Sequence, residues 1–175
     1  MRSQFTLATL VAVVSLAGCA GVMHGSDPMA SAKLEPTRGS ATAGMAMFHQ
    51  HADQVMVHVK VEGLKPGQAH GLHIHEKGDC SSGDGLSAGG HFNPAGKPHG
   101  PQDSSERQAG DLPALQADAQ GRAELRLRIA GIAVGSGAAD IVGKGLIVHA
   151  LPDDYRTQPT GNAGARIACA VIVRQ

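Results

Sequence analysis

Two histidines lie one residue apart in the segment HGLHIHEKGDC at residues 70–80. In an extended strand, side chains at positions i and i+2 point to the same face, about 6.5–7 Å apart along the backbone. His73 and His75 can therefore close on one metal ion, and imidazole suits copper, zinc, iron or nickel. Gly78 and Asp79 then begin a loop. The spacing predicts a metal site at the end of a strand.

A second group of metal-ligand side chains lies in residues 81–111, a segment too long for a connection without a purpose. His91, His99 and Asp111 are separated there by irregular backbone rich in glycine and proline, which lets side chains turn inward. Two imidazoles and one carboxylate are suitable ligands for a tetrahedral zinc site. The alternative, ordinary polar loop residues, does not explain why the histidines recur beside glycine and proline.

Strands must position these side chains, because alternating hydrophobicity recurs along the chain. Residues 55–61, VMVHVKV, place four valines on one face, as in a half-buried antiparallel strand. Residues 123–129 alternate again, with Leu125, Leu127 and Ile129 inward. Turns and further strands complete the pattern at 63–67, 118–121, 146–149 and 167–173. With no segment of helical period and length after the leader, we predict an all-β sandwich or flattened barrel.

The composition fits one domain preceded by a leader. The chain has 175 residues, enough to bury a core, and 24 glycines and 9 prolines that predict long loops. Its 15 basic residues equal its 15 acidic ones, which argues against a nucleic-acid partner. Among the ten histidines, we interpret His49, His51 and His58 as solvated strand positions, His70 as a loop residue, and His24 as incidental.

The amino terminus has the features of an export signal. Arg2 precedes an apolar run at 7–17, which is shorter than the ~20 residues of a membrane span. The run ends in LAGC, which resembles the bacterial lipoprotein cleavage box and implies acylation of Cys19; the alternative is an ordinary signal peptide. The predicted organisation is a lipoprotein signal peptide at 1–18, a flexible tether at 19–32 and one domain at 33–175.

From residue 70 to its end, the chain resembles the copper/zinc superoxide dismutases, and specifically their bacterial periplasmic branch. The matching motifs follow the family's order: HGLHIHEKGDC (70–80), SAGGHFNP (87–94), KPHG (97–100), AGDLPAL (109–115), GLIVHA (145–150) and TGNAGARIACAVI (160–172). The resemblance implies a Greek-key β-sandwich with long metal-binding loops and an electrostatic loop at 153–160. It also implies dismutation of superoxide to dioxygen and hydrogen peroxide.

The resemblance assigns a role to each matching side chain. The implied copper ligands are His73, His75, His91 and His149, and the implied zinc ligands are His91, His99 and Asp111. His91 would thus bridge one copper and one zinc ion per chain and supply a proton to the nascent peroxide. Arg166 would receive the superoxide anion. Cys80 and Cys169 match the family's disulfide, the alternative being two buried free thiols.

One position departs from the family pattern. The third zinc histidine of the family would fall where Gln108 stands, and a neutral amide carbonyl is a poorer partner for zinc than imidazole. Zinc would keep its other three ligands, with Gln108 or water as a weak fourth. We therefore expect weakened zinc binding or a copper-only enzyme, whereas the copper set is intact.

Two other function classes compete with this interpretation. A copper storage or delivery protein needs the copper ligands without Arg166, and a structural envelope lipoprotein needs neither metal. The intact histidines and Arg166 argue against both. We expect superoxide as substrate, no nucleic acid, and a periplasmic enzyme anchored through the lipid at Cys19. Ala20 favours the outer membrane, because the aspartate typical of inner-membrane retention is missing. Both a monomer and a homodimer stay open.

Overall fold

The computed structural model describes residues 27–175, and the chain forms an all-β structure there, as predicted. The strands are β1 (Met29–Pro36), β2 (Ala43–His51), β3 (Gln54–Glu62), β4 (Ala69–His70), β5 (Leu72–His75), β6 (Leu115–Gln116), β7 (Ala123–Ala130), β8 (Gly145–His149), β9 (Arg166–Val171) and β10 (Val173–Arg174). A short 3-10 helix, η1, covers Leu86–Ala88. No helix within the described residues is long and apolar enough to cross a membrane.

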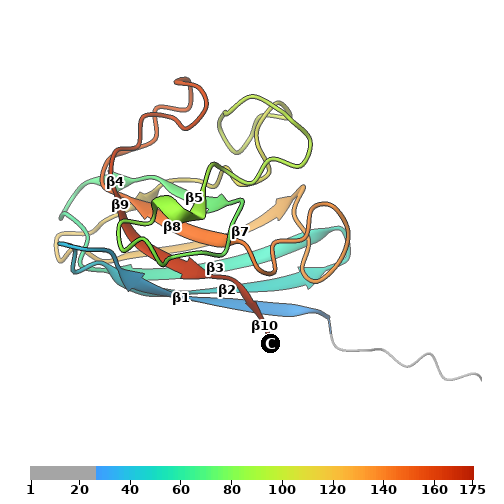
Figure 1. Ribbon diagram of the computed structural model, residues 1–175, viewed down its shortest axis with the longest axis horizontal. Coiled ribbons are helices and arrows are strands. Elements are labelled where there is room, and N and C mark those ends of the chain that lie inside the picture. The colour runs from blue at the N-terminus through green and yellow to red at the C-terminus, as the bar shows by residue number, and fades with distance from the viewer. Residues whose placement is uncertain (1–26) are drawn as a thin grey trace, which may run out of the picture.

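The main sheet is antiparallel and curls into a half-barrel (Figure 1). Its strands follow the order β5-β8-β9-β1-β2-β3-β7, with β10 also paired to β1, while β4 and β6 form a separate two-stranded sheet. β1 joins the two halves, because its first residues pair with β2 and its last two, Glu35 and Pro36, pair with β9. The result is two packed layers around one core.

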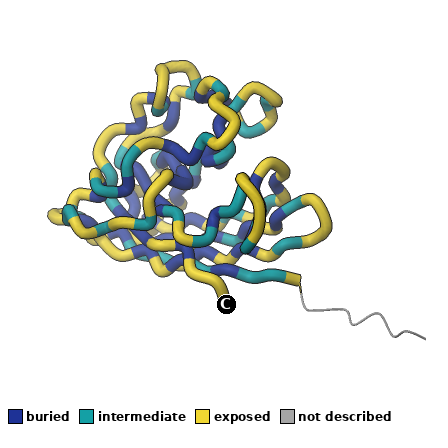
Figure 2. Tube along the Cα trace, turned by 45° about the vertical axis from the view of Figure 1, so that its right-hand side comes forward, coloured by how far each residue is buried: buried dark blue, intermediate teal, exposed yellow. Residues whose placement is uncertain are grey.

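The core lies where the apolar side of each strand faces the inside of the half-barrel. The four valines of β3 are buried, and the residues between them face solvent, so the predicted alternation is confirmed. Figure 2 shows the same alternation of buried and exposed residues along the strands. In β7, Ile129 is fully buried, whereas Leu125 and Leu127 are partly buried and pack against the edge of the core.

The domain begins earlier than the sequence indicated. β1 starts at Met29, so residues 29–32 belong to the barrel and not to the predicted tether at 19–32. Ala30 and Ala32 are completely buried in the core. The predicted signal peptide, Cys19 and His24 lie outside the described residues.

Two long connections cover the outer side of β5, β8 and β9. One runs from β5 to β6 and carries η1, and the other runs from β8 to β9. In Figure 1 both rise at the top, away from β1 and β2 at the bottom. The first connection carries the candidate ligands His91, His99 and Asp111, and the strands β5 and β8 carry the other three.

Candidate metal centre

β5 supplies the first two ligands because it is buried on both faces. Leu72 and Ile74 point into the core, while His73 and His75 point to the opposite side, beneath the long loops. Isolated β-bridges join the connection between β5 and β6 to β5 itself, with His91 opposite His75 and Asp111 opposite His73. The backbone therefore delivers loop ligands to the edge of β5.

The structure brings the four predicted copper ligands together. One ring nitrogen each of His73, His75, His91 and His149 lies within 4.8 Å of the others, and all four residues are buried. His149 reaches the group from the end of β8, where a register shift interrupts the pairing with β9. Each ring also has one buried nitrogen without a hydrogen-bond partner: Nδ1 of His73 and Nε2 of His75, His91 and His149. Unpaired buried polar atoms are rare in proteins, and four converging nitrogens fit a metal ion.

The second nitrogen of each of these rings bonds to the protein, and that of His91 bonds to Asp111. His75 Nδ1 donates to the carbonyl of Gly89 at 2.9 Å, and His149 Nδ1 donates to that of Gly164 at 3.3 Å. His73 Nε2 donates to Asp153 at 2.6 Å. Such outer contacts fix the tautomer, so that the lone pair of the free nitrogen points at the metal position.

Three of these rings are neutral at ordinary pH. Burial lowers the pKa of His73 to about 4, of His75 to about 2 and of His149 to about 3, because the charged form loses its hydration. Neutral imidazole is the form that binds metal, so protons compete weakly for this group.

The three predicted zinc ligands form a second group that shares His91. Asp111 Oδ1 accepts hydrogen bonds from Nδ1 of His91 and of His99, each at 2.9 Å. Its Oδ2 accepts the backbone N–H groups of Gly100 and Gln108. Burial raises the pKa of Asp111, but these hydrogen bonds outweigh it and hold the pKa at about 2. Asp111 is thus an anion, and a cation among its partners would be well compensated.

Gln108 lies beside this second group, and its side-chain oxygen has no hydrogen-bond partner. Its side chain is buried, and Nε2 donates to the carbonyl of Pro159 at 3.3 Å. Oε1 is buried without a hydrogen-bond partner. A buried carbonyl oxygen that lacks a donor costs free energy, and a cation would satisfy it. The residues present therefore fit zinc, with an amide oxygen where the family has imidazole.

Asp153 joins the two groups, and the sequence did not predict this role. Its carboxylate accepts hydrogen bonds from His73 at 2.6 Å and from His99 at 2.9 Å. Burial raises the pKa of Asp153, but the two imidazoles outweigh it and hold the pKa well below its usual range. Burial also disfavours charge on His99, yet Asp111 and Asp153 raise its pKa to about 9. The sequence offers one signal for this role: Asp153 is an acidic residue only four positions after the ligand His149.

Arg166 is fixed beside the four-histidine group. Its Nη1 donates to the carbonyl of Gly85 at 2.6 Å, and its Nη2 donates to that of Gly89 at 2.7 Å. Gly89 also accepts from His75, so one carbonyl positions a cation and a ligand. The predicted disulfide between Cys80 and Cys169 is confirmed and ties this loop to β9.

The remaining histidines divide into two kinds. His49 and His51 are exposed and His58 is half-buried on the outer strand faces, as predicted. His70 is not a loop residue: it lies in β4, is 1% exposed, and donates from Nδ1 to the carbonyl of His149 at 2.8 Å. His70 thus supports the backbone of a copper-site histidine without joining either ligand group.

Comparisons with known proteins agree with this geometry. A family model described as "Copper/zinc superoxide dismutase (SODC)" matches residues 42–172. A copper-zinc superoxide dismutase of Aquifex aeolicus is 36% identical over 150 residues, which cover 83% of this chain and 87% of that protein. A superoxide dismutase-like protein of Bacillus subtilis is 39% identical over 145 residues, covering 81% and 74%.

A solved structure shows that the likeness extends to three dimensions. The crystal structure of the clock protein EA4 superposes with a TM-score of 0.77 at 35% identity, covering 85% of this chain and 96% of that one. The folds agree, and the family match spans most of the barrel and both ligand groups. The chain therefore belongs to the copper/zinc superoxide dismutase family, as an enzyme whose cofactors are copper and zinc.

Proposed function

We propose that the chain catalyses copper-dependent dismutation of superoxide in the cell envelope. Two superoxide anions and two protons yield one dioxygen and one hydrogen peroxide. The observation that carries the proposal is the convergence of four buried imidazole nitrogens, each without a partner, on one position. Arg166 supplies the cation that such a reaction on an anion needs.

Each ligand group fits one of the two cofactors. Copper would be held by the four free nitrogens, Nδ1 of His73 and Nε2 of His75, His91 and His149. Zinc would be held by His91, His99 and Asp111, with Gln108 Oε1 or water as a weak fourth ligand. A bound copper ion would supply one-electron redox chemistry at this position. Zinc has no redox chemistry, so its role would be to hold the shared His91 ring in place.

The side chains around the copper position bind the substrate and deliver the proton. The guanidinium of Arg166 keeps its charge at any working pH, so it attracts and orients the anion. Its bonds to Gly85 and Gly89 prevent it from folding away. The Nε2 of His91 faces the copper position, so it would carry a proton only when it is not a metal ligand, and from there it would donate that proton to the nascent peroxide. Asp111 accepts a hydrogen bond from Nδ1, the other nitrogen of the same ring, and so fixes the ring's orientation.

A variant of His149 tests the assignment. His149→Ala removes one nitrogen from the copper group, and we expect loss of copper from the site and of superoxide turnover, with the fold retained. His51→Ala is the matched control, because His51 is exposed and remote from the group. Copper content and catalysed superoxide decay are measured on both. Normal turnover by His149→Ala would show that the copper ligands are assigned wrongly.

The proposed location is the periplasm, with a lipid anchor at Cys19. The LAGC sequence supports the anchor, and the Cys80–Cys169 disulfide is typical of exported proteins in an oxidising compartment. In a bacterial host, Cys19→Ala is expected to move the protein from the membrane fraction to the soluble periplasmic fraction without loss of activity. Recovery of the wild-type protein in the cytoplasm would overturn this location.

A further inference from the structure

The methionines of the described chain gather on one surface. Every methionine within residues 27–175 lies on the outward side of β1, β2 or β3, and none of them lies in the core. The three histidines remote from the metal centre lie on the same side. We call this surface the Met/His face, and its members are Met29, Met45, Met47, His49, His51, Met56 and His58.

Strand register pairs thioethers with imidazoles at the centre of this face. Met47 on β2 lies opposite His58 on β3, and the adjacent outward pair is His49 opposite Met56. Directly opposed side chains of antiparallel strands have Cβ atoms about 4.5–5.5 Å apart. The four side chains therefore lie at the corners of a small quadrilateral, and they line a groove on the sheet surface.

This exposure is unusual for methionine. Its flexible thioether side chain normally fills gaps in hydrophobic cores. Here Met47 and Met56 are 36% and 42% exposed, while alanine, valine, leucine, isoleucine and phenylalanine make up the core of this half-barrel. The sulfur atoms are consequently available to a ligand from solution.

His58 has the environment of a metal-binding imidazole. Its Nε2 is hydrogen-bonded to Glu124 at 2.7 Å. Histidines that bind metals through one ring nitrogen usually bond a carboxylate or carbonyl through the other. The contact directs Nδ1 away from Glu124, and the carboxylate adds a negative charge beside the groove.

The donor types and the neighbouring charges favour a soft monovalent cation. Thioethers are soft ligands that select Cu(I), and imidazole accepts the same ion. Both cysteines in the described part of the chain are in the disulfide, so only methionine offers a sulfur ligand there. Arg126 and Arg128 also line the groove, and their repulsion of a divalent ion is twice that of a monovalent ion.

We propose a second metal site on β2 and β3, selective for Cu(I), with four ligands: Met47, His49, Met56 and His58. The site faces away from the metal centre, because β1, β2 and β3 lie on the opposite side of the barrel from the long loops (Figure 1). The hydrophobic core separates the two positions. Copper held on this face therefore exchanges with solution and not with the metal centre through the protein.

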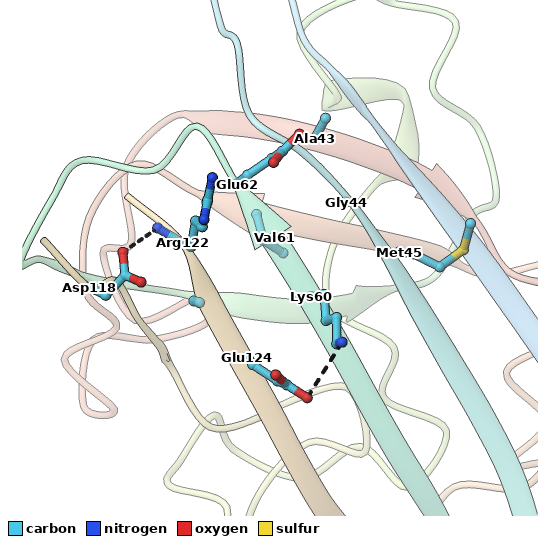
Figure 3. Close-up of a pocket in the computed structure, with 10 residues that line it drawn as sticks. Ala43, Gly44, Met45, Lys60, Val61, Glu62, Asp118, Arg122 and Glu124 are labelled. Carbon is cyan, nitrogen blue, oxygen red and sulfur yellow. Dashed lines mark hydrogen bonds and ion pairs between the residues drawn. The ribbon is translucent and has the colours of Figure 1, made fainter. Parts of the chain in front are cut away.

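Met45 marks the edge of the proposed site. It lies opposite Lys60 and not opposite a histidine. Figure 3 shows the neighbouring hollow that Met45 lines, where the Lys60 ammonium lies 3.9 Å from Glu124. A cation would be repelled by this ammonium, so Met45 provides a methionine on the same strand that should not bind it.

The test uses the full chain with copper and zinc already bound at the metal centre. The methionine methyl groups are labelled with ¹³C, and Cu(I) is added without oxygen, with ascorbate as reductant. We expect the Met47 and Met56 methyl resonances to shift on the first added equivalent, with the Met45 resonance unchanged. X-ray absorption of the added copper should show sulfur scattering, which a nitrogen and oxygen site cannot produce.

Variants identify the ligands. Met47→Leu combined with Met56→Leu keeps the apolar character of the face and should abolish the sulfur scattering, whereas Met45→Leu should leave it unchanged. Glu124→Gln should weaken Cu(I) binding by about tenfold, the usual cost of losing an outer contact of a ligating histidine. Superoxide turnover should be the same in all three, because none touches the metal centre.

Two results would overturn the proposal. Sulfur scattering that persists in the double leucine variant would place the ion elsewhere. A chain that is already dimeric without added copper, with its Met47 and Met56 methyl groups shielded from solvent, would make the face an interface between copies.

Discussion

At the residue scale, each imidazole of the four-histidine copper group has its two nitrogens in different surroundings. The ring nitrogens that face Gly89, Gly164 and Asp153 are bonded, and the opposite nitrogens converge without partners. The sequence predicted the ligands because histidine spacing and loop composition carry that information. It did not predict Asp153 or the burial of His70, because their partners lie about eighty positions away in the chain.

Gln108 gives the sharpest prediction at this scale. Gln108→His would replace a neutral carbonyl by imidazole, the better zinc ligand, at a buried position beside Asp111. We expect zinc affinity to rise by at least about tenfold, because even the outer contacts of a metal ligand change metal affinity by that factor and a direct ligand should change it at least as much. Competition with a zinc chelator measures the zinc affinity of both proteins.

Gln116→His is the control for that experiment, because Gln116 is exposed on β6 and should leave zinc affinity unchanged. An equal zinc affinity in wild type and Gln108→His would mean that position 108 does not contact the ion.

At the element scale, the strands differ in how clearly the sequence predicts them. β3 is evident in the sequence because its four valines alternate with Met56, His58 and Lys60, which face solvent. The first half of β1 resembles a tether in the sequence because its buried residues, Ala30 and Ala32, are small and match linker composition. Burial of alanine is decided by the neighbouring strands β2 and β9, which local patterning does not describe.

The loop between β8 and β9 depends on a glycine that touches the bridge between the two metal groups. A Cβ at Gly161 would overlap the Asp153 carboxylate and lie 2.5 Å from His99 Nε2. We expect Gly161→Ala to displace Asp153 and lower the affinities for zinc and copper, by roughly ten- to a hundredfold.

Gly137→Ala is the matched control, because Gly137 also has a positive φ, but no atom lies within 4 Å of its added Cβ. It therefore carries the backbone strain without the collision. If both variants lost metal equally, strain and not displacement of Asp153 would be the cause.

The disulfide joins the loop after β5 to β9. It spans 89 positions, and on the loop-entropy account a closure of this length is worth about 4–5 kcal/mol. Cys80→Ala combined with Cys169→Ala should lower the free energy of unfolding by about that amount, measured with urea. It should also slow superoxide turnover, because the loop that holds Arg166 loses its attachment. Unchanged turnover at full folding would show that Arg166 is positioned without the disulfide.

At the scale of the whole molecule, the metal-free protein should be most stable near neutral pH. His73, His75 and His149 have folded pKa values below their ordinary 6.5, so the unfolded chain binds protons that the folded chain excludes as the pH falls below about 6.5. That stability is present above pH 6.5 and is lost on acidification.

His99 acts in the opposite direction. Its folded pKa of about 9 gives stability that is complete below pH 6.5 and is lost as the pH rises through 9. Urea unfolding of the metal-free chain between pH 4 and pH 10 should therefore show a maximum near pH 6.5, with a steeper fall on the acid side. Stability that increased steadily toward acid pH would contradict the buried neutral state of the three copper-site histidines.

The copper-loaded chain provides the most direct test of the central claim. Superoxide is generated by pulse radiolysis, and its decay is followed with the copper-loaded protein, with and without added zinc. We predict a catalysed decay close to the diffusion limit, ~10⁸–10⁹ M⁻¹s⁻¹, when copper is bound. Dependence of the fast decay on added zinc would show that Gln108, His91, His99 and Asp111 still form a working zinc site. A chain that binds copper at the four histidines and does not accelerate the decay would be a copper carrier and would contradict the account.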